Sequence, residues 1–152
     1  MNNDVVTFLY HEVSDNPNLT GFLRKSNLIY KHNCREFANN IEAINNVKIK
    51  PITINGLEDK SEKHKILLTF DDGGKSSMYI ADVLEKYNWY GHFFITTSMI
   101  GNSTFLNKLN IKELFHRGHV IGTHSHSHPM PFHNLPIQRM IEEWSKSIDI
   151  LE

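Results

Sequence analysis

The hydrophobic residues of this chain follow two kinds of pattern that alternate along it. Short runs of apolar, β-favouring residues predict buried strands, because a strand covered on both faces reads as a nearly continuous apolar segment. Four runs of this kind stand out, and a shorter candidate lies between the first two. The predicted strands are 5–10 (VVTFLY), 66–70 (ILLTF), 91–97 (GHFFITT) and 119–123, with the shorter candidate at 51–54.

Between these runs, apolar residues recur at the spacing of an amphipathic helix. The pattern predicts helices at 35–46, after the DDGG at 71–74, before Gly118, and from Asn134 and Pro136 onward. We expect each helix to turn its apolar stripe toward the core. The stripes are Phe37, Ile41 and Ile44; Ile80, Val83, Leu84 and Tyr87; Ile111, Leu114 and Phe115; and Ile137, Ile141, Trp144, Ile148 and Leu151.

Strands that alternate with helices predict an α/β protein built on a parallel sheet or barrel. The charged segment 58–65 reads as a solvated loop or helix surface. No internal repeat, low-complexity tract or Pro/Ser-rich linker divides the chain, so residues 1–152 are expected to form one domain.

Composition narrows the class of function. The formal net charge of -1 gives no bias toward nucleic acid or an anionic membrane surface. The start MNNDVVTFLY lacks the features of a signal peptide, and no segment reaches membrane-spanning length, so a cytoplasmic location is expected. Cys34 is the single cysteine, which rules out an internal disulfide. Of the 10 histidines, six lie between His116 and His133, which favours a site over an even spread.

Ionisable side chains follow three of the predicted strands directly. His11 and Glu12 follow the first, Asp71 and Asp72 follow ILLTF, and the histidine run GTHSHSHP follows the last. In parallel α/β folds the carboxyl ends of the strands meet at one rim. The sequence therefore predicts that these groups gather there.

The geometry of GTHSHSHP has two readings. In an extended strand, His124, His126 and His128 would share a face. In a helical turn or coiled loop, His124 and His128 would pair and His126 would point elsewhere. A divalent metal held by Asp72, His124 and His128 would keep open coordination positions, and Asp71 would be free to act as a general base.

Each of these features also has a plain structural interpretation. The sequence DDGG is a common way to form a tight turn and a helix N-cap, and a histidine-rich loop is often a solvated surface. His11 is expected to be a rim histidine bonded to backbone. His92, His116, His119 and His133 are expected to have no carboxylate partner. Only the joint occurrence of Asp and His groups at successive strand ends favours a metal-dependent hydrolase.

Three segments resemble a known family. They are LTFDDG at 68–73, HSHSHP at 124–129 and FLYHEVS at 8–14. The first two are similar to the first two motifs of the polysaccharide deacetylase family, the NodB-homology domain of carbohydrate esterase family four. The third is similar to a Tyr-His stretch near the start of many members.

This resemblance implies a role for each matching residue. Asp71 would be the catalytic base, while Asp72, His124 and His128 would bind zinc or another divalent transition metal. Ser125 would be a loop-stabilising hydroxyl, His11 a supporting residue, and His126 would lie outside the ligand set. The implied reaction removes N-acetyl groups from amino sugars of a glycan and releases acetate.

The later motifs of the family, which carry an arginine, an Asp/Trp pair and a general-acid histidine, are not found in this sequence. Arg139 lacks the expected Pro-Tyr companion. The general acid is therefore unassigned, and the resemblance predicts the first half to two thirds of a deformed (β/α) barrel. Such a fold would leave an open sheet edge and an exposed apolar helix face through which the chain could self-associate. Two other hypotheses stand: a metal-dependent amidohydrolase for a small C–N substrate, and an inactive, truncated domain.

Overall fold

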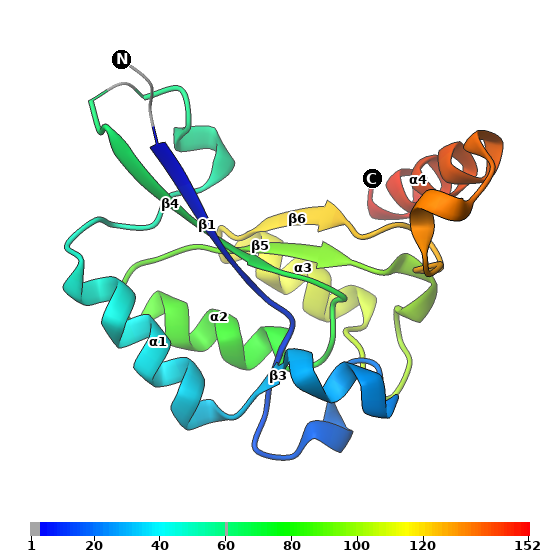
Figure 1. The fold of residues 1–152 in the computed structure, drawn as a ribbon, viewed down its shortest axis with the longest axis horizontal. Coiled ribbons are helices and arrows are strands. Elements are labelled where there is room, and N and C mark those ends of the chain that lie inside the picture. The colour runs from blue at the N-terminus through cyan, green and yellow to red at the C-terminus, as the bar shows by residue number, and fades with distance from the viewer. Residues whose placement is uncertain (1–3, 60) are drawn as a thin grey trace.

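The fold is a parallel sheet with helices, as the alternating pattern predicted. The computed structural model describes residues 4–59 and 61–152 (Figure 1). Four strands form the main sheet in the order β1-β4-β5-β6, and each neighbouring pair is parallel. These strands are β1 (Asp4–Tyr10), β4 (His64–Phe70), β5 (His92–Ile95) and β6 (Val120–Thr123).

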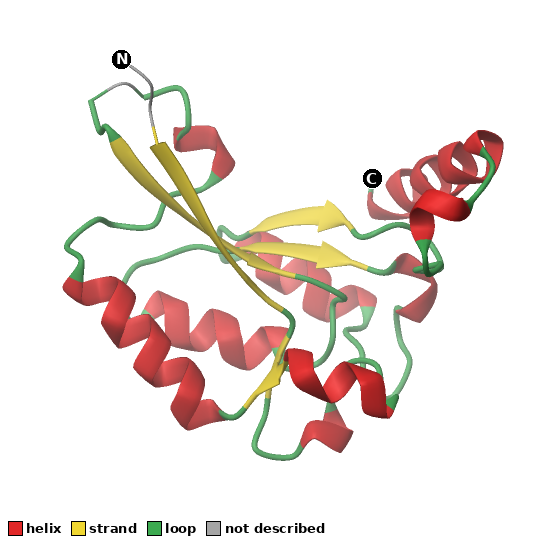
Figure 2. Ribbon diagram, in the orientation of Figure 1, coloured by secondary structure: helices red, strands yellow, loops and turns green. Residues whose placement is uncertain are grey.

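Four helices accompany the sheet: α1 (Cys34–Asn46), α2 (Ser77–Glu85), α3 (Lys108–His116) and α4 (Ile137–Leu151) (Figure 2). Asn33 and Asn107 open α1 and α3, each with a side chain that accepts a hydrogen bond from the backbone of the first turn. A small parallel sheet pairs β2 (Glu12–Val13) with β3 (Lys31–His32). Short 3₁₀ helices lie at Pro17–Leu19, Lys25–Tyr30, Ile54–Gly56, Thr97–Met99 and Phe132–Asn134.

The core lies between the sheet and helices α1 to α3. Alternate residues of β4 point into it, so that Leu68 and Phe70 are buried together with Phe93 of β5. The helices contribute the apolar stripes that their spacing predicted: Phe37, Ile41 and Ile44 from α1, Ile80, Val83 and Leu84 from α2, and Ile111 and Leu114 from α3. The buried clusters of helix and sheet thus form one continuous core.

The last helix differs from its prediction. Most of its apolar stripe does not face the core: Ile137, Ile141, Trp144 and Ile148 are exposed, and only Leu151 at the end of the helix packs partly against the core. Its buried residues are Glu143 and Ser147, which lie toward the loop that follows β6. Figure 1 shows α4 beyond β6, away from the other helices. Within the described residues most of the stripe is uncovered, apart from Leu151 and a ring contact of Phe132 with Trp144, which agrees with the exposed helix face that a partial barrel predicted.

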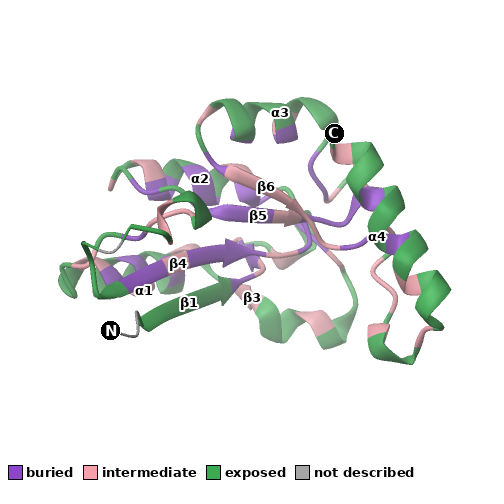
Figure 3. Cartoon of the chain, turned by 90° about the horizontal axis from the view of Figure 1, so that it is seen from above, coloured by how far each residue is buried: buried purple, intermediate pink, exposed green. Residues whose placement is uncertain are grey.

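Strand β1 is also more exposed than its apolar sequence predicted. Only Tyr10 at its end is buried, whereas Val5 to Leu9 are open, because β1 pairs with β4 on one side and forms an edge of the sheet (Figure 3). The open edge expected of a partial barrel is therefore present.

Smaller predictions also needed correction. Residues 51–54 form no strand: the Ile52 N–H donates to the Ile66 carbonyl, but a 3₁₀ helix begins at Ile54. Tyr87 lies beyond the end of α2 but still packs against the core, whereas Phe115 faces solvent. Pro136, not Asn134, precedes α4. The predicted loop 58–65 gives its last two residues to β4, and its Lys60 lies outside the described residues.

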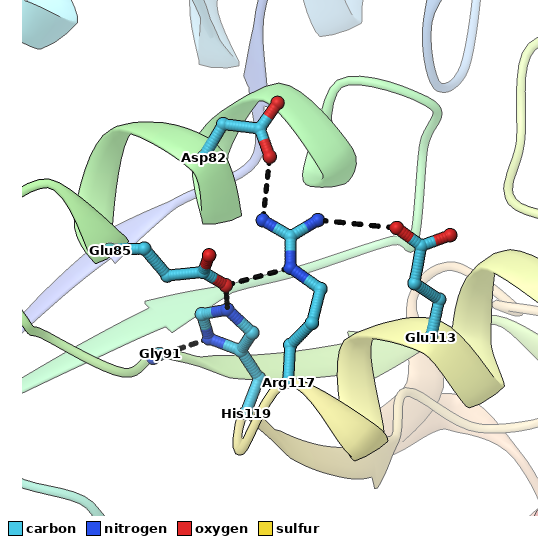
Figure 4. A network of polar contacts seen from close by, with 6 residues as sticks. All are labelled: Asp82, Glu85, Gly91, Glu113, Arg117 and His119. Atoms are coloured by element: carbon cyan, nitrogen blue, oxygen red, sulfur yellow. Dashed lines mark hydrogen bonds and ion pairs between the residues drawn. The ribbon is translucent and has the colours of Figure 1, made fainter.

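A polar network closes the end of the sheet where β5 and β6 begin (Figure 4). Arg117 pairs with Asp82 at 2.6 Å, Glu85 at 2.7 Å and Glu113 at 3.5 Å. His119 is buried; its Nδ1 accepts from the Gly91 N–H and its Nε2 donates to Glu85 at 3.0 Å. The prediction that His119 has no carboxylate partner is therefore wrong.

Two other histidines of that group, His92 and His116, bond to backbone. His92 Nδ1 donates to the Leu68 carbonyl and His116 Nδ1 donates to the Lys112 carbonyl. In the part of the chain that the structure describes, no helix has both the length and the apolar character needed to cross a membrane.

Candidate metal centre

Three parallel strands deliver ionisable side chains to one rim, as their positions in the sequence predicted. His11 follows β1, Asp71 and Asp72 follow β4, and the histidine loop follows β6. The Asp72 carboxylate lies 3.5 Å from His124 and 3.6 Å from His128, measured from Oδ1 to each Nε2. Residues more than 50 positions apart in sequence thus meet, because parallel strands end at the same edge.

The DDGG segment forms the turn that positions Asp72. The Asp71 N–H donates to the Tyr10 carbonyl at 2.9 Å, and the Asp72 carbonyl accepts from the Thr96 N–H at 3.2 Å. Asp72 and Gly73 both have left-handed backbones, with φ of 73° and 77°. The left-handed φ favours glycine at Gly73, and a Cβ there would also make a tight contact with Ile95, at 3.0 Å. The expected tight turn is confirmed, but α2 begins after Ser76 and not with the turn itself.

The histidine loop takes the second of the two geometries considered from sequence. The strand ends at Thr123, and Ser125 and His128 adopt left-handed φ of 65° and 54°. The loop therefore turns back, which brings the rings of His124 and His128 to a centroid distance of 5.0 Å. His126 points elsewhere and its Nδ1 lies 2.9 Å from Thr97 Oγ1.

The three side chains offer a donor set that fits a divalent transition metal. One ligand atom from each of Asp72, His124 and His128 lies within 4.8 Å of the others. Ligand bonds of about 2.0–2.2 Å in tetrahedral geometry need donors roughly 3.3 Å apart, close to the two distances measured from Asp72. Asp72 Oδ1 is buried and makes no hydrogen bond within residues 4–59 and 61–152. A buried oxygen without a partner is costly, and a cation at this point would supply one.

The electrostatics of the donors also suit a cation. Burial, together with repulsion by Glu12 and Asp71, raises the pKa of Asp72 to about 7, against an opposing effect of Lys31. Burial lowers the pKa of both His124 and His128, so both imidazoles are neutral near pH 7 and can donate a lone pair.

Asp71 and His11 lie beside the donor set and outside it. Burial raises the pKa of Asp71, while nearby His11 acts in the opposite direction. Burial lowers the pKa of His11. The His11 ring stacks on Tyr30 with centroids 4.8 Å apart, and no backbone hydrogen bond to it is found in the described chain, contrary to expectation.

The histidine loop is held by one residue that was expected from sequence and by two that were not. The expected one is Ser125, whose Oγ accepts a hydrogen bond from the His128 N–H at 3.2 Å. The Glu143 carboxylate accepts from the N–H and Oγ of Ser127, and Ser147 Oγ donates to the Ser125 carbonyl at 3.1 Å. Glu143 and Ser147 stand four positions apart, opposite the apolar stripe of α4. That spacing is the only sequence signal for a shared role.

A pocket of about 420 Å³ opens beside the two histidines. Its wall combines His124 and His128 with Met130, Phe132 and Trp144. Phe132 packs against Trp144 edge to face, with centroids 6.1 Å apart. The donor set thus borders an open, largely apolar space. Trp89, in contrast, is buried in the core.

Comparisons with known proteins give one consistent answer. A model of the family described as polysaccharide deacetylase matches residues 58–152. A peptidoglycan-N-acetylglucosamine deacetylase of Listeria monocytogenes is 37% identical over 67 residues, which cover 43% of this chain and 14% of that protein. A peptidoglycan-N-acetylmuramic acid deacetylase of Bacillus subtilis is 35% identical over 71 residues, or 45% of this chain and 26% of that protein.

The fold is shared with solved structures. A polysaccharide deacetylase from Bacillus cereus superposes with a TM-score of 0.80 at 20% identity, over 99% of this chain and 47% of the other. This chain therefore spans about half the length of that structure and a smaller share of the curated relatives. The α/β fold predicted as part of a larger barrel agrees with this coverage.

Proposed function

Because this chain belongs to the polysaccharide deacetylase family, we propose that it is a metal-dependent hydrolase that removes N-acetyl groups from amino sugars of a glycan and releases acetate. The observation that carries the proposal is the convergence of Asp72, His124 and His128 around a buried, unpartnered carboxylate oxygen. The curated relatives are named as deacetylases of N-acetylglucosamine and N-acetylmuramic acid in peptidoglycan, which supports an acetylated amino sugar as substrate.

In this proposal Asp72, His124 and His128 hold the metal. Two imidazoles and one carboxylate suit zinc or a similar divalent transition ion. Such an ion supplies a Lewis acid that polarises the amide carbonyl. The left-handed turns at Asp72, Ser125 and His128 fix the donors before any ion binds.

Asp71 is the general base of the proposed reaction. It neighbours the donor set without joining it, so its carboxylate is free to take a proton from the attacking water. Burial raises the pKa of Asp71, which brings a carboxylate closer to the working range of a base. His11 supports Asp71 from beside it, where its effect on the pKa of Asp71 opposes that of burial.

The pocket beside His124 and His128 is the place we assign to the substrate. Its opening beside His124 and His128 would bring an N-acetyl group next to the two histidine donors. The apolar side chains of Met130, Phe132 and Trp144 suit the carbon-bound faces of a sugar ring or the acetyl methyl group.

Metal content and acetate release test the proposal together. We would measure both on the parent chain and on Asp72→Ala, His128→Ala and Asp71→Asn, with N-acetylglucosamine oligomers as substrate. His126→Ala is the matched control, because this histidine lies in the same loop and outside the donor set.

The expected result separates the roles. Asp72→Ala and His128→Ala should lose both metal and acetate release, and Asp71→Asn should keep metal but release less acetate by about two orders of magnitude or more. His126→Ala should keep both. A parent chain that binds no divalent transition metal would refute the ligand assignment, and bound metal without acetate would refute the reaction.

A further inference from the structure

A second buried carboxylate lies behind the donor set and has no place in the reaction described above. Glu12 follows β1 in sequence and is only 2% exposed. Its Oε2 accepts hydrogen bonds from Thr20 Oγ1 and, at 2.6 Å, from Ser76 Oγ. Its Oε1 is buried without a hydrogen bond in the described part of the chain. A carboxylate so deeply buried is rare without a function or a charged partner.

The chain makes room for this carboxylate with two glycines. A Cβ at Gly21 would lie 2.7 Å from the Glu12 Cδ and Oε1, and a Cβ at Gly74 would overlap the carboxylate oxygens. Gly74 belongs to the same DDGG turn as Asp72. The turn that presents the donor oxygen therefore also packs directly on Glu12.

The hydrogen bonds that Glu12 accepts link it to two segments near the metal centre. Ser76 joins Glu12 to the start of α2, and its Oγ also accepts from the Val13 N–H at 3.0 Å. Thr20 joins Glu12 to the loop before Phe22, and its Oγ1 accepts from the Ser76 N–H at 2.8 Å. The Phe22 ring lies 5.1 Å from the ring of His128.

The charge of Glu12 reaches Asp72 without being neutralised by a direct ion pair. Lys31 is the nearby cation, but its Nζ donates to the Pro17 and Thr20 carbonyls, each at 2.7 Å. Glu12 packs against the turn that carries Asp72, and Lys31 Nζ bonds to the Thr20 carbonyl beside the Glu12 network, so two opposite charges lie near the donor carboxylate.

We propose that Glu12 is a positioning residue of the metal centre, whose buried negative charge behind Asp72 strengthens the binding of a divalent cation while Lys31 moderates it. The proposal rests on the proposed metal site and adds a residue that never touches the metal. Its physical basis is that the protein interior screens charge weakly. A carboxylate that does not touch the metal can therefore still attract a cation by Coulomb interaction.

Two substitutions with opposite expected effects test this idea. Glu12→Gln keeps the shape of the side chain and removes the negative charge, and Lys31→Met removes the positive charge and keeps an apolar stem. The probe is Zn²⁺ alone, and its affinity is measured by competition with a chromogenic chelator well above pH 7, where Glu12, whose pKa burial raises to about 7, is ionised. Thermal unfolding of each metal-free variant shows whether it folds.

We expect Glu12→Gln to bind Zn²⁺ about tenfold more weakly than the parent chain. Lys31→Met should bind it about threefold more tightly, a smaller effect because the lysine is partly exposed and screened. A purely structural role would weaken binding in both variants. The inference would therefore be overturned if Glu12→Gln bound Zn²⁺ as tightly as the parent chain, or if Lys31→Met bound it more weakly.

The same experiment separates this inference from the proposed function. A parent chain that binds no Zn²⁺ refutes the metal site itself, and with it any role of Glu12 there. A parent that binds Zn²⁺ with variants of unchanged affinity refutes only Glu12. If Glu12→Gln does not fold, the direction of the change in Lys31→Met decides the question alone.

Discussion

Glu143 accepts two hydrogen bonds from Ser127, one from its N–H at 2.6 Å and one from its Oγ at 2.7 Å. This pair fastens α4 to the loop that carries His124 and His128. A helix whose apolar stripe is exposed is thus held by a polar contact at the candidate metal centre.

Loss of the Glu143 carboxylate should loosen this loop. Glu143→Ala removes the charged acceptor of both Ser127 donors, and because Ser127 is itself exposed and can bond to water, we expect the free energy of unfolding to fall by about 1 kcal/mol. Zn²⁺ affinity should fall in the same variant. Glu142→Ala is the control, because Glu142 is exposed and pairs only with Arg139. Denaturant unfolding and chelator competition measure the two effects. Equal stability of the two variants would contradict a stabilising role for the Glu143–Ser127 contact.

Substitution of Gly74 should test the packing of the DDGG turn on Glu12. A Cβ in Gly74→Ala would overlap the Glu12 carboxylate, which is boxed in and cannot move freely, so we expect a loss of about 1–3 kcal/mol. Gly101→Ala is a useful comparison, because a Cβ there meets nothing within 4 Å, although its φ of 87° carries conformational strain. Thermal unfolding should rank Gly74→Ala below Gly101→Ala, and the reverse order would count against a tight contact.

The burial of Glu12 should make the metal-free protein less stable at alkaline pH. Burial raises the pKa of Glu12 from 4.5 to about 7, so the folded state prefers the protonated carboxyl. The resulting penalty is absent below pH 4.5 and grows as the pH rises toward 7. Glu12→Gln should therefore exceed the parent in stability by about 2–3 kcal/mol well above pH 7, and by little in acid. Unfolding measured with a chelator present checks this, and a constant difference across pH would exclude it.

The His119–Glu85 pair should give the protein part of its acid sensitivity. Burial lowers the pKa of His119 from 6.5, so the folded state prefers the neutral ring. Its contribution to stability is fully present above pH 6.5 and is lost as the pH falls through the folded pKa. Hydrogen bonding to Arg117 lowers the pKa of Glu85. The contribution of Glu85 to stability is therefore lost only at a lower pH than that of His119.

A His119→Asn variant isolates this effect from the histidines of the metal centre. The stability advantage of the parent over the variant should shrink as the pH drops below 6.5. Chelator-treated samples followed by denaturant unfolding at several pH values measure it. An advantage that stays constant into acid would mean that His119 does not titrate between the two states.

Much of the centre could be predicted from sequence because its chemistry follows a simple rule. Apolar runs marked the strands, and the groups placed directly after them, Asp71, Asp72 and the histidines, met at one rim. From the residues alone, a loop that pairs His124 with His128 could not be distinguished from a strand that places all three histidines on one face. The structure decides it through the left-handed turns at Ser125 and His128.

The supporting residues could not be predicted, since their roles depend on partners distant in sequence. Glu143 lies on the polar side of an amphipathic helix, where periodicity predicts exposure, yet it contacts Ser127. Glu12 is charged and follows an edge strand, and only the approach of Thr20 and Ser76 buries it. The predicted core face of α4 failed for a related reason: hydrophobic spacing indicates which side is apolar, not whether anything covers it.

The left-handed backbone at Asp72, Ser125 and His128 has a consequence for how an ion would enter. These conformations are held by hydrogen bonds from β5, α4 and the loop itself, so the entropic cost of ordering the donors is met when the chain folds. An ion would then meet a preorganised receptor and lose little affinity to rearrangement. Chelation should accordingly empty the centre without melting the fold, in contrast to small domains that need their metal to fold.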